Sequence, residues 1–408
     1  MKISERIRSW VRTKKTILLD AEPHPFPPPY CRMVAINSDV EYTRWETQLT
    51  LLRTFADFGL ETAFSFWFFN DPKTTWRLFE ENGEEGVHAR SAYELIRGGL
   101  LDTIHSFGGK LNGDGCSFDR SAIERAYDHL AANGLRCEVY SNHGTVKDVQ
   151  NVGGAWCESH GALNYQKGDV VGSQCYHLDL TLAHGVRFFW LDIDRVRTIN
   201  SFRPAATSEP DSLFEIQDTR DGRRILRFKR TDTGVDPIAR EFHQQVSAVL
   251  AAPTGGYSII YTHLGVHRDA EGRPYAVGEP VFEPSAVAAL HDLRDAQRRG
   301  DVLVTTTSRL LRHALMMTVR PWEATSLGRE ITVRFKPAVR FEGLDLRFGW
   351  NDFEGFTLPV KSRQVVRAWL GDQQRELSNV ESASGSYATL PWRPIDVGCV
   401  LEEAERAA

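Results

Sequence analysis

Polar residues that can do acid–base or metal chemistry end several apolar runs of this sequence. Asp39 and Glu41 follow the first run, and His105, His143 and His263 end later ones. A carboxylate can act as a general base or bind a metal ion, and neutral imidazole is the commonest metal ligand in proteins. This combination indicates an enzyme. The runs are residues 33–39, 62–70, 101–105, 136–143, 173–177, 186–194 and 257–263.

The candidate catalytic residues are carboxylates and one histidine. Asp39 and Glu41 stand two positions apart, as do Asp192 and Asp194, so each pair projects to one side if its strand continues. His263 ends an apolar run and is placed to protonate a leaving group or to stabilise an oxyanion. The plainer interpretations are a helix-capping Asp39 with a surface Glu41, and one acid of the later pair bound to a nearby arginine.

The expected metal ligands are Asp39, His105 and His143. Glycine residues follow each histidine closely, which lets the backbone turn near a ligand. A lone histidine at such a place is more often a satisfied core residue, so the hypothesis depends on their convergence. The expected cofactor is a divalent metal ion, zinc or a similar ion. The expected substrate-binding residues are Asn142, Trp190, Trp67 and Arg195.

The elements that must position these residues alternate between strand and helix. Such an alternation closes most readily into a parallel α/β barrel, whose active site lies at the carboxyl ends of the strands. The sequence therefore predicts a seven-stranded (β/α) barrel over residues 31–322. Residues 202–234 interrupt the alternation and are expected to form an inserted hairpin, with a turn at 219–223, or a lid. Helical periodicity marks residues 45–59, 91–97, 121–133, 236–251 and 283–299.

Residues 1–30 and 323–408 differ in character from the barrel region. The first are a basic arm followed by a proline-rich linker, and the last alternate apolar and polar residues between turn residues. That alternation is typical of antiparallel strands with one solvated face, so residues 323–408 are expected to form a small β-sandwich. The arm has apolar residues near one helical face, which leaves a weak membrane-surface contact as the alternative to a solvated arm.

Composition excludes several classes of protein. The formal charge of -5 and the pI near 6.2 give no overall attraction to nucleic acid. The 6 cysteines have no C-x-x-C spacing, which is typical of reduced thiols in a cytosolic protein. No run reaches the roughly 18 apolar residues of a membrane span, and no signal peptide is recognisable. We therefore expect a cytoplasmic protein without a transmembrane segment.

At these residues the chain resembles the polysaccharide deacetylase (NodB-homology) superfamily, which includes carbohydrate esterase family 4. The segment Ser38-Asp39-Val40-Glu41 is similar to the acidic first motif, and His105-Ser106 to the start of the metal-binding motif. Residues 256–263 are similar to the last motif, an apolar strand that ends in a histidine. The resemblance covers residues of about 31–320 and implies a seven-stranded barrel.

The resemblance also implies roles for individual residues. It implies that Asp39 is the general base or a metal ligand, that His105 is a ligand and that His263 is the general acid. The metal would polarise the amide carbonyl and the attacking water. Two positions depart from the family pattern, because Tyr42 replaces an acid and Gly109 replaces a histidine. The available replacement ligands are Glu41 and His143.

The leading hypothesis is therefore a metal-dependent N-deacetylase that acts on an amino sugar or a polysaccharide precursor in surface polysaccharide biosynthesis. One alternative is a metal-independent glycoside hydrolase, in which Asp39 or Glu41 faces Asp192 or Asp194 at about 5–10 Å. Another is a noncatalytic sugar-binding protein on the same barrel. The altered ligand positions favour the binding protein, whereas the retention of both His105 and His263 favours an enzyme.

Overall fold

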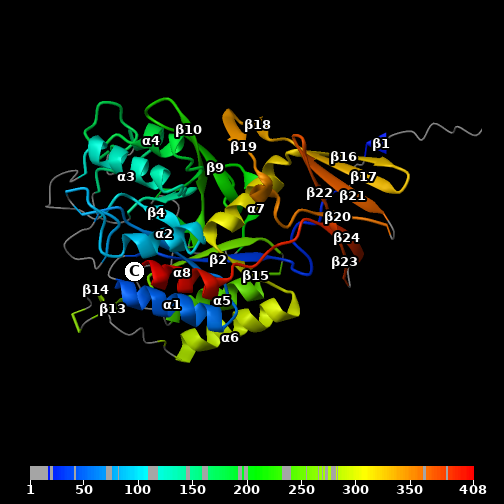
Figure 1. Cartoon of the computed structure of the whole chain (residues 1–408), viewed down its shortest axis with the longest axis horizontal. Helices are drawn as coiled ribbons and strands as arrows, with labels where there is room; N and C mark the ends of the chain where they lie inside the picture. Colours follow the sequence, from blue (N-terminus) through cyan, green and yellow to red (C-terminus); the bar gives the residue numbers. More distant parts are fainter. Residues whose placement is uncertain are drawn as a thin grey trace, which may run out of the picture. The chain divides into compact units, whose positions relative to one another are not determined.

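The structure is a computed structural model, shown in Figure 1. It describes residues 17–18, 22–40, 43–69, 76–80, 82–108, 118–143, 148–158, 164–191, 195–196, 201–231, 240–253, 255–264, 266–268, 270–271, 274–276, 282, 284–361, 364–382 and 385–408. At 17–18, 195–196, 240–241, 266–268 and 274–276 it describes the backbone alone. Among the residues singled out above, Glu41, Tyr42, Gly109, Asp192 and Asp194 lie outside the described residues, and the side chain of Arg195 is not described.

Contacts divide the chain into two compact units. The larger unit comprises Tyr30–Thr318 together with Pro394–Ala408. The β-rich unit comprises the described residues up to Pro29 together with Val319–Arg393. This division differs from the expected domains at both ends of the chain, because the N-terminal residues group with the β-rich unit and the last residues group with the larger unit.

A large, mostly parallel sheet places the candidate residues at the carboxyl ends of its strands. The central strands are buried at every residue except Tyr261, as a parallel sheet covered on both faces requires. Their pairings are parallel. In sheet order they are β12 (Tyr257–Thr262), β2 (Met33–Ser38), β3 (Ala63–Phe66), β4 (Leu101–His105), β5 (Val139–Ser141) and β6 (Phe188–Trp190), and β15 (Leu303–Thr305) also pairs with β2.

The segment expected as a hairpin or a lid adds strands to this sheet. The hairpin is confirmed, because β9 (Ser212–Asp218) and β10 (Arg224–Phe228) pair in antiparallel fashion around residues 219–223. β10 then pairs in parallel with β6, and β11 (Arg230–Thr231) pairs in parallel with β12. Only Lys229 separates β10 from β11, which is the arrangement that a barrel strand between β6 and β12 requires. The hydrogen-bonded path through the described residues does not close, so the barrel stays a prediction.

The remaining strands of the larger unit are short. β7 (Arg195–Val196) pairs with β11, and β8 (Arg203–Ala206) pairs in parallel with β9. β13 (Val266–Arg268) and β14 (Pro274–Ala276) form a separate antiparallel pair.

The strand predicted at residues 173–177 is wrong. This stretch consists of turns, in which the Tyr176 amide bonds back to the Ser173 carbonyl, and His177 precedes the helix α4 (Leu178–Ala183). The run is short, and its serine favours a turn, in which the Ser173 hydroxyl accepts a hydrogen bond from the Cys175 amide. His177, which ends this run, therefore lies beside a helix and not at a strand end.

Helices cover the sheet, and none of those described is long and apolar enough to cross a membrane. The Asp119 carboxylate caps α3 by accepting a hydrogen bond from the Ala122 amide, and Gly59 ends the first helix with a φ of 71°. Figure 1 shows α8 beside α1 and α2, which it contacts. The helices are α1 (Trp45–Asp57), α2 (Ala89–Arg97), α3 (Arg120–Ala132), α5 (Arg240–Ala251), α6 (Pro284–Arg299), α7 (Thr307–Val319) and α8 (Val397–Ala407).

The β-rich unit has small sheets with alternating burial. In β17 (Glu330–Phe335), Ile331, Val333 and Phe335 are buried and the residues between them are not. One sheet runs β1 (Ile17–Leu18), β16 (Trp322–Leu327), β17, β21 (Val365–Leu370) and β22 (Gln373–Glu376). The others pair β18 (Ala338–Phe341) with β19 (Leu344–Arg347), and β20 (Thr357–Pro359) and β23 (Ser378–Ser382) with β24 (Gly385–Thr389). The pairing of β17 with β21 is parallel, which the expectation of antiparallel strands did not include.

Candidate active site

The parallel strands bring several of the predicted residues to one edge of the sheet. These are Asp39 after β2, Trp67 after β3, His105 at the end of β4, Asn142 and His143 after β5, Trp190 at the end of β6 and His263 after β12. Because these strands are neighbours with the same direction, their carboxyl ends meet. The contacts described below show which of these side chains also meet.

Asp39 is the centre of this group. The side chain is 1% exposed, and its Oδ2 atom lies 3.3 Å from the Nη2 atom of Arg230. Its Oδ1 atom accepts no hydrogen bond from the described residues and lies 3.8 Å from Nδ1 of His105. A buried carboxylate is stable only when it is paired, and the guanidinium of Arg230 supplies that pairing.

Arg230 is a site residue that the sequence analysis missed. Its guanidinium lies between two aromatic rings, 3.6 Å from the ring centre of Trp190 and 3.8 Å from that of Tyr261. Cation–π contacts of this kind contribute up to about 2 kcal/mol each when they are shielded from water. The available signal was its position after the apolar residues of β10, the pattern used for the other strands. Its segment was instead expected to form an inserted hairpin or a lid.

Trp67, His105 and His143 form an aromatic cluster beside Asp39. The Trp67 ring is stacked on His105 at a centroid distance of 5.9 Å and meets His143 edge-on at 5.5 Å. The two imidazoles are 5.3 Å apart and nearly perpendicular. The sequence therefore predicted correctly that residues from consecutive strands lie together here.

The loop after β5 holds His143 in place. Asn151 accepts a hydrogen bond from the His143 amide and donates one to the His143 carbonyl, at 3.1 Å and 2.8 Å. Nδ1 of His143 lies 3.4 Å from Oδ2 of Asp148, which itself accepts a hydrogen bond from Gln150. Asp148 was also missed, because it stands in a loop with no pattern of its own.

The remaining predicted residues have other contacts. Nε2 of His263 is 3.0 Å from the Tyr261 hydroxyl, which connects it to the ring that covers Arg230. The Asn142 side chain bonds both the amide and the carbonyl of Val152, so it anchors the loop. Trp67 and Trp190 are 2% and 4% exposed, and each has one face covered by a site residue. Their roles in substrate binding stay predictions.

His177 contacts the loop after β5 through its ring. Its Nε2 atom lies 2.8 Å from the Gln150 carbonyl, and its Nδ1 atom lies 2.9 Å from the Thr181 hydroxyl. A carbonyl can only accept, so Nε2 carries the proton. Burial lowers the pKa of His177 to about 4, so the ring is neutral at neutral pH. These contacts give it a packing role.

The residues fit a divalent cation in part. Asp39 Oδ1 and His105 Nδ1 are a carboxylate oxygen and an imidazole nitrogen that face each other, and both are ligands that zinc accepts. Within the described ranges no group of at least 3 histidine, cysteine or acidic side chains surrounds one point. A further ligand would come from His143, in ring contact with His105, or from Glu41, which lies outside the described residues.

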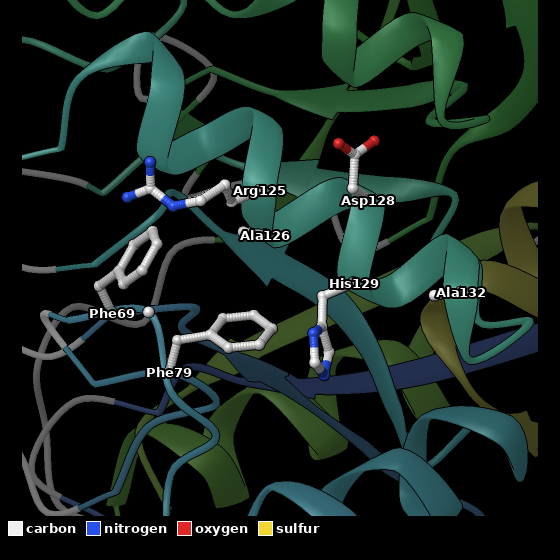
Figure 2. A pocket seen from close by; sticks show the side chains of 8 residues that line it. Phe69, Phe79, Arg125, Ala126, Asp128, His129 and Ala132 are labelled. Carbon is white, nitrogen blue, oxygen red and sulfur yellow. The ribbon is translucent and has the colours of Figure 1, made fainter.

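A pocket of about 370 Å³ lies apart from this group of residues. Figure 2 shows Arg125 and His129 of α3 on one side and the rings of Phe69 and Phe79 on the other, with Asp128 pointing away from the rings. It shares no lining residue with the strand-end site. Because its lining includes neither Asp39 nor a site histidine, we do not assign the chemistry to it.

Comparison of the chain with models of protein families, with curated proteins and with solved structures gave no match. The functional argument therefore depends on the geometry of the strand-end site.

Proposed function

We propose that the protein is a carbohydrate-active hydrolase, specifically a metal-dependent N-deacetylase acting on an amino sugar or a polysaccharide precursor. The observation that carries this proposal is the buried pair of Asp39 and His105, 3.8 Å apart, with His143 in ring contact with His105. Such acids and imidazoles at the carboxyl ends of parallel strands are typical of hydrolytic metal sites. The resemblance to polysaccharide deacetylases favours an amide bond as the target.

Two residues would transfer protons. Asp39 would accept a proton from the attacking water, and Arg230 would position its carboxylate by the contact with Oδ2. His263, held by the Tyr261 hydroxyl, would donate a proton to the departing amine. A divalent ion held by Asp39 and His105, with His143 or Glu41, would supply Lewis-acid polarisation of the carbonyl and of the water.

The substrate class is the second part of the proposal. Aromatic side chains at the strand ends suit sugar rings, which pack on aromatic faces. We place the reaction in the cytoplasm, on a precursor of a surface polysaccharide. The glycoside hydrolase alternative needs Asp39 or Glu41 opposite Asp192 or Asp194. Of these four, only Asp39 lies within the described residues, so this alternative stays a prediction.

The test measures acetate released from N-acetylated amino-sugar oligosaccharides with zinc present. The wild type should release acetate, and Asp39→Asn and His263→Ala should reduce kcat by about 100-fold or more. His129→Ala is the matched control, because His129 pairs with Glu85 on the protein surface, outside the site. Glycosidic cleavage without acetate would favour the glycoside hydrolase. Binding without any cleavage would favour the sugar-binding protein.

A further inference from the structure

Asn37 lies directly beneath the candidate site. It is part of β2, two residues before Asp39, so the two side chains project to the same side of the strand. It is 1% exposed. A buried amide must satisfy its donors and its acceptor within the protein. The hydrogen-bond partners of Asn37 therefore determine how its amide is oriented.

The hydrogen bonds of Asn37 fix the orientation of its amide. Nδ2 donates to the hydroxyls of Thr103 and Thr307, at 3.2 Å and 3.1 Å. Oδ1 accepts from Nη1 of Arg230 at 3.0 Å. An arginine can only donate, so the amide oxygen must face Arg230 and the amide nitrogen must face the two hydroxyls. The alternative orientation would place donors against donors.

The Thr103 hydroxyl is itself fixed, and Thr307 belongs to a helix. Thr103 donates to Oδ1 of Asp102 at 2.9 Å, so its oxygen is left to accept from Asn37. Oδ2 of the same aspartate accepts the amide hydrogen of Ser308 at 2.7 Å. Thr307 and Ser308 form the first turn of α7. The start of α7 therefore holds Asn37 from the side opposite Arg230.

We propose that Asn37 and Thr307 are positioning residues that set the orientation of the Arg230 guanidinium on Asp39. Nη1 is committed to Asn37 and Nη2 to Asp39, while Trp190 and Tyr261 confine the guanidinium plane. Removal of the Thr307 hydroxyl leaves one Asn37 hydrogen without an acceptor. The amide is then held by one hydrogen bond fewer, so the acceptor that it presents to Arg230 is less firmly fixed. Whether this orientation serves catalysis rests on the proposed function.

The chain offers a matched pair of substitutions. Thr306 and Thr307 are adjacent, both are fully buried, and the Thr306 hydroxyl has no hydrogen-bond partner among the described residues. Thr307→Val removes the acceptor for Asn37, whereas Thr306→Val makes the same atomic change without removing a hydrogen bond. Thr307→Ser keeps the hydroxyl and should behave as the wild type.

The test uses NMR of the full chain with 15N-labelled arginine. The Arg230 signals are assigned by their loss in Arg230→Lys, and the measured quantity is the rate of rotation that exchanges its two Nη groups. We expect roughly tenfold faster rotation in Thr307→Val, because one buried hydrogen bond is lost. Thr306→Val and Thr307→Ser should match the wild type. Equal rates in Thr307→Val and Thr306→Val would overturn the proposal. If Thr307→Val does not fold, the comparison is made with Thr307→Ala and Thr306→Ala.

A kinetic measurement separates this inference from the proposed function. If the wild type releases acetate, Thr307→Val should lower kcat about tenfold without a change in KM, and Thr306→Val should change neither. An unchanged kcat in Thr307→Val, despite faster Arg230 rotation, would overturn the catalytic part of the inference. If the wild type releases no acetate, the proposed function fails, and the NMR result alone decides whether Asn37 and Thr307 position Arg230.

Discussion

Buried ion pairs distinguish the two units of the molecule. Among the described residues, the larger unit contains the buried pairs of Arg230 with Asp39, Arg309 with Glu61 and Arg220 with Asp169, beside exposed pairs such as Arg299 with Asp301. In the β-rich unit, the pair of Arg367 with Glu330 has side chains that are 41% and 46% exposed. A buried charge costs several kcal/mol in desolvation, whereas an exposed pair contributes about 0–1 kcal/mol. A charge retained in the interior of the larger unit therefore has a structural or a chemical task.

The buried pairs also differ from one another in the hydrogen-bond partners of their carboxylates. The pair of Arg309 with Glu61 has further partners within the fold, since Thr305 and the Ile395 amide also donate to Glu61. The Asp39 carboxylate instead keeps one oxygen without a hydrogen bond from the described residues, and that oxygen faces His105. The first pair serves structure, and the second is available for chemistry.

The largest expected effect comes from breaking a structural pair. Arg309→Met leaves Glu61 buried, and only neutral donors remain for it. We expect the free energy of unfolding of the larger unit to fall by about 3–5 kcal/mol, measured by urea denaturation. A loss below about 1 kcal/mol would show that the buried pair contributes no more to the free energy of unfolding than an exposed pair does.

The next effect concerns Asp169, whose carboxylate accepts hydrogen bonds from the amides of Gly153 and Gly154 and from Arg220. Burial raises the pKa of Asp169, but the hydrogen bonds and the charge of Arg220 outweigh it and hold that pKa below its ordinary value. A carboxyl with a lowered pKa stabilises the fold above its unfolded pKa of about 3.9, and this contribution is lost as the pH falls through the folded pKa.

Asp169→Asn should therefore cost about 2–3 kcal/mol at neutral pH and less at acidic pH. Urea denaturation of both proteins from about pH 7 to pH 3 measures this difference. A difference that stays constant, or that grows as the pH falls, would contradict the assignment.

A smaller effect should appear at His177. Its pKa is lowered by burial to about 4, below the ordinary value of 6.5. The unfolded chain therefore binds this proton more readily, so the contribution of His177 to stability is complete above pH 6.5 and declines as the pH falls toward 4. NMR of the histidine ring, assigned with His177→Asn, should show no titration between about pH 8 and pH 5. A midpoint near the ordinary pKa would contradict its buried, neutral state.

The smallest effect should come from the exposed pair of the β-rich unit. Arg367→Met makes the same change as Arg309→Met, but Glu330 stays in contact with water. We expect the free energy of unfolding to change by about 1 kcal/mol or less. A loss as large as that in Arg309→Met would remove the contrast between the two units.

Some elements could be predicted from the sequence because local signals agree. The strand Leu101–His105 has the expected bounds, since glycines precede it and an apolar run fills it. The helix α7 was not predicted, because Thr305, Thr306 and Thr307 are β-branched residues that favour strands. The helix α8 was missed because the β-rich pattern before it was extended to the end of the chain.

Only some residues of the candidate site could be predicted from the sequence. The strand-end rule placed Asp39, His105 and His143 together, because each follows an apolar run. Arg230 also follows apolar residues, those of β10, but its approach to Asp39 depends on how the hairpin of β9 and β10 joins the sheet. That pairing is long-range and leaves no local pattern in the sequence.

The most direct test of the central claim is a zinc titration of metal-free protein by isothermal calorimetry. The claim is that Asp39 and His105 hold a divalent ion. It predicts about one zinc site per chain that is lost in Asp39→Asn and in His105→Ala, and retained in the surface variant His129→Ala. A chain that binds no zinc, or a site that survives both Asp39→Asn and His105→Ala, would contradict the claim.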